Sequence, residues 1–241
     1  MKKDPISTVL FDLDGTLLPM NQEHFARHYF ETLAKWLAPH GYDPEKLIGS
    51  MWKGISAMVQ NDGTRTNETV FWNVMQRIYG DAILADLPVF EEYYRADFLR
   101  LREECGLEPQ AVQIVRRLRE SGIGVALATN PVFPFIATEA RIRWAGLEPE
   151  DFAFYTSYEN SSHCKPDPAY YTEVAARMGV LPERCLMVGN DTIDDTAAAE
   201  VGMKVFLVTD CLVDSKARGV GDFPNGSFSE MVKYLEQEVL A

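Results

Sequence analysis

Short apolar runs recur along the chain at intervals that suit a parallel sheet. Five of them have the length and composition of buried strands, namely residues 7–12, 124–130, 152–157, 185–190 and 204–210. Runs of this kind, separated by helical patterns, are typical of βαβ units. The pattern therefore predicts an α/β protein with a Rossmann-like core, in which helices cover both faces of a parallel sheet.

Helical periodicity fills most of the gaps between these runs. Residues 107–121 carry apolar side chains at helical spacing. The Asp167-Pro168 pair predicts the start of another helix, which should run to Gly179, because Asp is a favoured N-cap and Pro is favoured at the first helical position.

The gap after the first strand is too long for an ordinary crossover. Residues 20–103 show no strand pattern, and we expect them to form a helical cap domain inserted into a core made of residues 1–19 and 104–241. Two helical stripes are expected within the insertion: Phe25, Tyr29, Leu33 and Trp36 on one, and Val70, Val74 and Ile78 on the other. Trp36, Trp52 and Trp72 are expected to build its small core.

Composition and net charge argue against a nucleic-acid partner. At 46% hydrophobic and 24% charged residues the chain is that of a globular protein, and 23 Lys+Arg against 36 Asp+Glu give a net charge of −13. Nucleic-acid binding needs clustered cations to neutralise phosphates, so we expect no nucleic-acid partner.

Cysteine usage and hydropathy favour the cytoplasm. The four cysteines are far apart and form no CxxC pair, which predicts neither a zinc site nor a disulfide framework. Asp4, Pro5 and Asp12 interrupt any N-terminal leader, and no apolar run approaches the ~20 residues of a membrane span. We expect no membrane partner.

The first predicted strand ends in a pair of carboxylates. Asp12 and Asp14 stand at i and i+2 and project to one side of an extended chain, and Gly15 lets the chain turn away. Ligands of open parallel sheets bind at the carboxyl ends of strands. Because neighbouring carboxylates repel, the pair suits a nucleophile beside a general acid, or a shared cation, although an isolated acidic pair is also common in plain turns.

Other strand ends carry groups that suit a phosphate and a metal ion. Thr129-Asn130 offers hydroxyl, amide and backbone donors, and Lys165 stands beside a helix entrance; alone, each is also an ordinary loop residue. Asp191 follows the fourth strand, and with Asp12 and Asp14 it offers the oxygen ligands that Mg²⁺ prefers.

These segments together resemble the four ordered motifs of the haloacid dehalogenase superfamily. The matching segments are DLDGTLL at 12–18, Thr129-Asn130, Lys165-Pro166 and VGNDTIDD at 188–195. The resemblance spans about residues 7–210, and the helical insertion stands where the helical-cap subgroup carries its cap.

The resemblance implies a role for each residue. Asp12 would take the phosphoryl group as an aspartyl-phosphate, and Asp14 would protonate the leaving alcohol and then activate water. Thr129 and Lys165 would bind phosphoryl oxygens, and Mg²⁺ would be held by Asp12, the Asp14 carbonyl and an acid of the fourth motif.

The fourth motif departs from the family pattern, which leaves the metal ligands open. Many members have Asp directly after the motif's glycine, where this chain has Asn190. We favour Asp191 as ligand with Asp195 in support; the alternative is that Asn190 coordinates and Asp194 supports.

The expected activity is Mg²⁺-dependent hydrolysis of a small phosphorylated metabolite, such as a sugar phosphate or short organic phosphate. Asp14 argues against a dehalogenase, which typically lacks this second acid. A phosphomutase or phosphotransferase stays open, as does a catalytically silent phosphate-binding protein, although Asp12 and Lys165 are both present. Monomer and homodimer are equally compatible with the sequence.

Polar residues near the insertion are weaker candidates for substrate contact. The candidates are residues 60–65 and Lys53; the alternative is that they belong to an exposed interhelical loop. His24 and His28 stand at i and i+4, but without a third ligand they are expected to be surface histidines. His163 is either close to the crevice or an ordinary loop residue.

Overall fold

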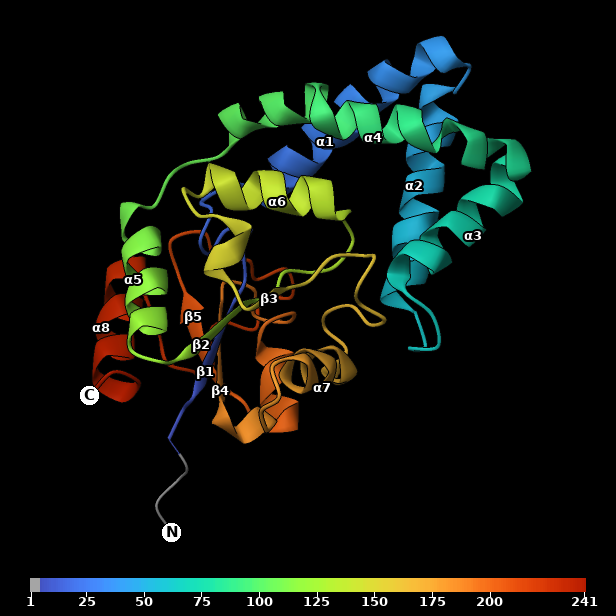
Figure 1. The fold of residues 1–241 in the computed structure, drawn as a ribbon. Coiled ribbons are helices and arrows are strands. Elements are labelled where there is room, and N and C mark those ends of the chain that lie inside the picture. The colour runs from blue at the N-terminus through green and yellow to red at the C-terminus, as the bar shows by residue number, and fades with distance from the viewer. Residues whose placement is uncertain (1–4) are drawn as a thin grey trace.

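The computed structural model describes residues 5–241 and contains one parallel sheet (Figure 1). Its strand order is β3-β2-β1-β4-β5-β6. Residues 1–4, part of the stretch in which no leader is expected, lie outside the described residues. Because β1 is flanked by β2 and β4, the carboxyl ends of these three strands are neighbours.

The strands are β1 (Thr8–Phe11), β2 (Gly124–Leu127), β3 (Phe154–Tyr155), β4 (Cys185–Gly189), β5 (Lys204–Val208) and β6 (Asn225–Gly226). The helices around the sheet are α5 (Pro109–Glu120), α6 (Phe135–Trp144), η4 (Pro149–Asp151), α7 (Pro168–Arg177), η5 (Pro182–Arg184), η6 (Thr196–Val201) and α8 (Phe228–Glu238). The insertion consists of α1 (Gln22–Leu37), η1 (Ala38–His40), α2 (Pro44–Val59), α3 (Asn67–Tyr79), η2 (Asp81–Asp86), α4 (Leu87–Arg95) and η3 (Asp97–Glu104).

Helices cover both faces of the sheet. Successive side chains of a strand point to opposite faces, so Val9 and Phe11 pack into the cluster that holds the apolar stripes of α5 and α8, while Leu10 packs with α7. Figure 1 shows α5 and α8 on one side of the sheet and α7 on the other. The Rossmann-like α/β prediction is confirmed.

The predicted strands exist but are shorter than their apolar runs. The last residues of each run leave the ladder at the carboxyl edge, and β3 also begins two residues into its run, at Phe154. The short edge strand β6 was not predicted. The helix beginning at Asp167 forms as expected: the Asp167 carboxylate accepts the Ala169 N–H at 2.8 Å, and Pro168 is the first helical residue.

Residues 20–103 form helices that lie above the carboxyl edge of the sheet (Figure 1). The stripe on α1 is largely as expected, with Phe25, Tyr29 and Leu33 buried. On α3 the buried residues are Asn67, Phe71 and Met75, one position beyond the expected stripe of Val70, Val74 and Ile78, which is half-buried. The Phe71 ring packs tightly against Gly54 of α2, where a Cβ would lie only 2.5 Å from the ring, and this contact turns α3 so that Phe71 is buried.

The two chain segments that connect the insertion to the core lie side by side. Met20 forms an isolated antiparallel bridge with Cys105, and the Gly106 N–H donates to the Pro19 carbonyl at 2.7 Å. A Cβ on Gly106 would meet the Pro19 side chain at 3.1 Å, so the close approach favours glycine. The insertion therefore leaves and re-enters the core at one place.

Hydropathy and thiol chemistry add little to this architecture. None of the helices in the described part of the chain has the length and apolar character needed to cross a bilayer. All four cysteines are free thiols, two of them buried.

Candidate active site

The ends of β1, β2 and β4 line one cavity of about 470 Å³ between the core and the insertion. Most of the residues predicted for the site lie on its wall: Asp12, Asp14, Thr129, Asn130, Lys165, Asp191, Asp194 and Asp195. They come from sequence positions up to 183 residues apart (195 − 12) and meet because parallel strands end at the same edge. Asn190 is not part of the lining.

Lys165 lies between two carboxylates at the floor of the cavity. Its Nζ is 2.9 Å from Asp12 Oδ1 and 2.7 Å from Asp195 Oδ1, and the side chains of all three are at least nine-tenths buried. Burial alone would lower the pKa of Lys165, but the two carboxylates raise it well above the usual value, so the ammonium stays charged. Burial raises the pKa of Asp12 to about 7 despite the opposing effect of Lys165.

Asp14 has two partners that the sequence did not reveal. Arg141 of α6, which is fully buried, forms an ion pair with Asp14 Oδ2, and Gln22 of α1 donates its amide to the Asp14 backbone carbonyl. Burial raises the pKa of Asp14, and Arg141 and then Lys165 lower it. The Arg141 guanidinium also stacks on Phe133, 4.3 Å from the ring centroid.

Neighbouring residues of the fourth motif lie in different places and make different contacts. Asn190 is buried beneath the site: its side chain accepts from Thr16 Oγ1 at 3.2 Å and donates to the Cys211 carbonyl at 2.6 Å. Asp195 uses Oδ2 to accept the N–H groups of Asn190 and Asp191, at 2.8 and 2.9 Å. Asp191 lines the cavity and Asn190 does not, which favours Asp191 as the cation ligand; its Oδ1 already accepts the N–H groups of Ile193 and Asp194, at 2.7 and 2.8 Å.

Asp194 joins the second motif to the fourth. Its carboxylate accepts from the Asn130 amide at 3.2 Å. Burial raises the pKa of Asp194 to about 6, and Lys165 opposes the shift. Thr129 is held through its backbone, because its carbonyl accepts from Thr156 Oγ1 and the Tyr170 hydroxyl.

The donor set fits a hard divalent cation. Asp12, Asp191 and the Asp14 carbonyl offer only oxygen atoms, as Mg²⁺ requires. Two of the buried side-chain oxygens without a hydrogen-bond partner in the described residues, Asp14 Oδ1 and Asn130 Oδ1, also belong to this site. Buried oxygens of this kind need a cation, a water or a ligand donor to offset their desolvation.

The weaker candidates from the insertion lie elsewhere. Lys53 is exposed and, like residues 60–65, does not contribute to the cavity wall. His163 lies outside the wall too and binds Glu173 at 3.0 Å. Instead, the wall includes Trp52, which is 52% exposed, and Trp72; the expectation that these tryptophans only build a small core is wrong for Trp52.

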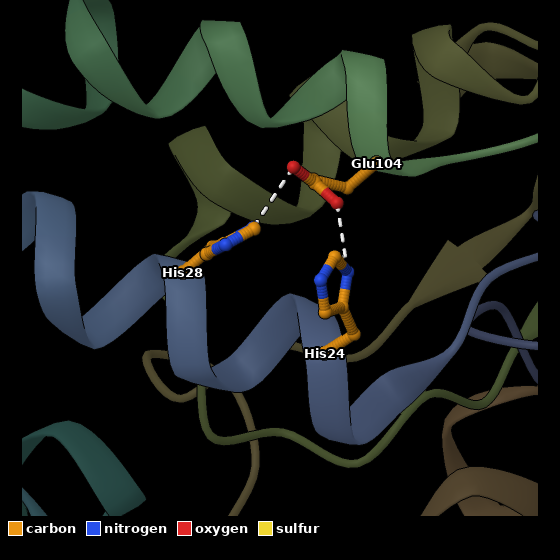
Figure 2. Close-up of side chains that lie close together, drawn as sticks. All are labelled: His24, His28 and Glu104. Carbon is orange, nitrogen blue, oxygen red and sulfur yellow. Dashed lines mark hydrogen bonds and ion pairs between the residues drawn. The ribbon is translucent and has the colours of Figure 1, made fainter.

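His24 and His28 do have a third partner. Both point their Nδ1 atoms at the carboxylate of Glu104 at the end of η3, at 2.9 and 2.8 Å (Figure 2). The expectation of two unassisted surface histidines rested on the absence of such a residue, which lies 76 positions beyond His28 and has no local sequence signal.

The fold and the site place the chain among α/β enzymes whose polar groups gather at the carboxyl edge of a parallel sheet. The family model of haloacid dehalogenase-like hydrolases matches residues 6–202. The chain therefore belongs to this family of hydrolases, as the four motifs indicated.

Named relatives and solved structures agree with that assignment. The chain is 27% identical over 184 residues to hexitol phosphatase A of Escherichia coli K12, covering 74% of this chain and 72% of the relative. It is 28% identical over 213 residues to phosphoglycolate phosphatase of Salmonella typhimurium LT2, covering 83% and 80%.

Two solved structures share the fold over nearly the whole chain. A 2-haloacid dehalogenase from Pseudomonas syringae pv. Tomato DC3000 superposes with a TM-score of 0.63 at 23% identity, covering 96% of this chain and 99% of the other. A phosphatase of the same superfamily from Thermococcus onnurineus gives 0.58 at 19% identity, covering 97% and 99%. At these identities the likeness concerns the fold alone.

Proposed function

We propose that this hydrolase is a Mg²⁺-dependent phosphatase that acts on small phosphorylated metabolites through a phosphoryl group carried on Asp12. One observation carries the proposal: Asp12 and the buried, charged Lys165 lie 2.9 Å apart at the floor of the cavity between the core and the insertion. Relatives named as phosphatases support the same reaction class.

In the first half-reaction, an Asp12 carboxylate oxygen attacks the phosphorus atom, and the bond from phosphorus to the ester oxygen breaks. Lys165 offsets negative charge on the phosphoryl oxygens, and Thr129 and Asn130 orient them. Lys165 keeps this charge at any ordinary pH because Asp12 and Asp195 raise its pKa, overcoming the effect of burial.

Asp14 gives its proton to the departing alkoxide and later takes one from the water that attacks the phosphorus of the Asp12 phosphate. Arg141 favours the ionised form of Asp14, whereas burial and an incoming phosphate dianion favour the protonated form. Arg141 thus positions Asp14, and substrate binding adds the negative charge that lets Asp14 hold a proton.

Asp12, Asp191 and the Asp14 carbonyl would hold Mg²⁺, which when bound neutralises charge on the transferring phosphoryl group. Asp195 supports this set from below, through the N–H groups of Asn190 and Asp191. Residues 20–103 act in this proposal as a cap domain that encloses the substrate, and the cytoplasm is the proposed compartment.

The test is hydrolysis of 4-nitrophenyl phosphate by wild type, Asp12→Asn and the exposed control Asp222→Asn, each with Mg²⁺ and with chelator. We expect turnover in wild type and Asp222→Asn only, and only with Mg²⁺. Full activity in Asp12→Asn refutes the nucleophile, and equal activity with chelator refutes the metal requirement. Transfer of the phosphoryl group to an added alcohol in preference to water would instead indicate a phosphotransferase.

A further inference from the structure

The upper wall of the active-site cavity is built from aromatic rings. Eleven of its lining residues are Phe, Tyr or Trp, among them Tyr29, Trp52 and Trp72 of the insertion and Phe133 and Tyr158 of the core. Aromatic rings contribute large apolar area, and they favour apolar or ring-bearing ligands.

The polar atoms of this wall are mostly occupied by one another. The hydroxyls of Tyr29 and Tyr94 bind each other at 2.8 Å, and Trp72 donates to the Tyr158 hydroxyl at 3.4 Å. The hydroxyl groups of a polyol placed here would lose water without gaining matched partners, which weakens binding for each unpaired group.

Three charged groups of the wall, Glu91, Arg95 and Glu159, also have partners, whereas the Glu68 carboxylate has none among the described residues. Glu91 pairs with Arg95 at 3.1 Å, and the Glu159 carboxylate accepts the Phe135 N–H at 2.9 and 3.0 Å. The wall therefore offers ring faces more than free donors.

We infer that the leaving group of the substrate is an alcohol that carries an aromatic ring, in place of a sugar or short organic acid. This inference rests on the proposed phosphatase function. The ring would lie against the aromatic wall while the phosphate sits between Lys165 and Thr129. It replaces the sequence-based expectation of a sugar phosphate with a class that the wall can desolvate.

The experiment compares kcat/KM for 2-phenylethyl phosphate, ethyl phosphate and glycerol 1-phosphate, all esters of primary alcohols. We expect 2-phenylethyl phosphate to exceed both others by about 10- to 100-fold, as burial of one ring permits. Trp52→Ala should reduce the ratio of phenylethyl to ethyl phosphate several-fold. The exposed control Leu181→Ala, which lies outside the cavity wall, should leave that ratio unchanged.

The outcomes separate this inference from the phosphatase proposal. If glycerol or ethyl phosphate is hydrolysed as well as 2-phenylethyl phosphate, the aromatic class is refuted and the phosphatase stands. If 4-nitrophenyl phosphate and all three esters are inert with Mg²⁺, both are refuted.

A second, independent observation concerns His24, His28 and Glu104, the His/Glu cluster of Figure 2. One potential ligand atom from each residue lies within 4.8 Å of the others. Two histidines one helical turn apart and a carboxylate from a second element form a donor set that binds Zn²⁺ in proteins.

The spacing of the donor atoms fits a single ion. Bonds of about 2.0–2.2 Å at tetrahedral angles place donors about 3.3 Å apart. His24 Nδ1 lies 2.9 Å from Glu104 Oε2 and His28 Nδ1 lies 2.8 Å from Glu104 Oε1, so each histidine needs to move away from the carboxylate by only a few tenths of an ångström. The side chains are 26–45% exposed, which gives an ion access from solvent.

We propose that the His/Glu cluster binds a borderline divalent cation such as Zn²⁺, separately from the Mg²⁺ of the active site. The ion would join α1, which carries Gln22 and part of the cavity wall, to the residue directly before Cys105. Its binding would therefore tie together the two segments that connect the insertion to the core.

Zn²⁺ titration by calorimetry tests the proposal in the full chain carrying Asp12→Asn and Asp191→Asn, which removes the carboxylates expected to bind Mg²⁺. We expect one Zn²⁺ per chain, with affinity at least tenfold weaker after His24→Gln or His28→Gln and unchanged after the exposed control His40→Gln. Co²⁺ should give the visible absorption of a tetrahedral site, and His28→Gln should abolish it. If the stoichiometry and affinity are the same with and without the two histidines, the proposal is refuted.

Discussion

The ion pair between Arg141 and Asp14 makes a direct test of how the core supports the site. Arg141→Met keeps an unbranched, largely apolar side chain but removes the guanidinium, and with it the charge and the stacking on Phe133. Among the described residues, Lys165 is then the cation that still lowers the pKa of Asp14.

The expected loss of stability follows from burial. Exposed pairs contribute about 0–1 kcal/mol, whereas removing one partner of a buried pair costs about 3–5 kcal/mol. The Arg141 side chain is 1% exposed and that of Asp14 is 20% exposed. Because Asp14 also has the option of taking up a proton, we expect the lower end of the buried range, about 3 kcal/mol.

Urea unfolding in the presence of chelator measures this loss for Arg141→Met, Asp14→Asn and the double variant. The sum of the two single losses in the free energy of unfolding should exceed the loss in the double variant by about 2 kcal/mol, since the second change removes a group already left unpaired. Arg143→Met, on the same helix but 49% exposed, should cost less than about 1 kcal/mol. Additive losses, or a loss in Arg141→Met as small as in Arg143→Met, would falsify the assignment of a buried pair.

Two further predictions concern residues at the floor of the cavity and beneath it. Burial raises the pKa of Asp12 to about 7, so protons compete with the cation for this carboxylate below that pH. The affinity for Mg²⁺ should therefore weaken as the pH falls from 8 to 6, by up to about tenfold per pH unit. Calorimetry that finds the same affinity at pH 8 and pH 6 would contradict this prediction. Gly15→Ala should cost more stability than Gly80→Ala. Both glycines have a positive φ, at +87° and +79°, but a Cβ on Gly15 would overlap the Asn190 amide, whereas a Cβ on Gly80 would meet no atom. Equal urea midpoints for the two variants would contradict this reasoning.

The core could be predicted from the sequence because its strands are continuous apolar runs and its strand ends carry the polar residues. The N-cap at Asp167 and the sharp turn at Gly15 are local signals of the same kind. The face of α3 could not be predicted as well, because apolar residues occupy adjacent positions around the helix. Whether α3 buries Phe71 or Val70 depends on the surface of α2, where Gly54 lets the Phe71 ring pack closely.

The residues that escaped prediction act through contacts distant in sequence. Arg141 stands in a helix with apolar and polar residues on every side, so nothing local marks it as a partner of Asp14, 127 positions away. Gln22 and Glu104 are ordinary polar residues until the fold brings them to the Asp14 carbonyl and to the two histidines. Such pairings are set by tertiary packing, which short-range periodicity does not contain.

The paired connections at Pro19 and Gly106 bear on how such an enzyme changes its substrate. Because the two ends of the insertion lie side by side, the insertion is topologically a loop whose ends are already closed. The closure entropy of a flexible loop changes by only about 0.6 kcal/mol when its length doubles. A different helical unit joined at the same two residues would keep the core's own strand ends and Lys165, and would need a substitute for the Gln22 contact with the Asp14 carbonyl. The part of the molecule that contacts the leaving group is thus free to diverge while the part that handles the phosphate stays constant.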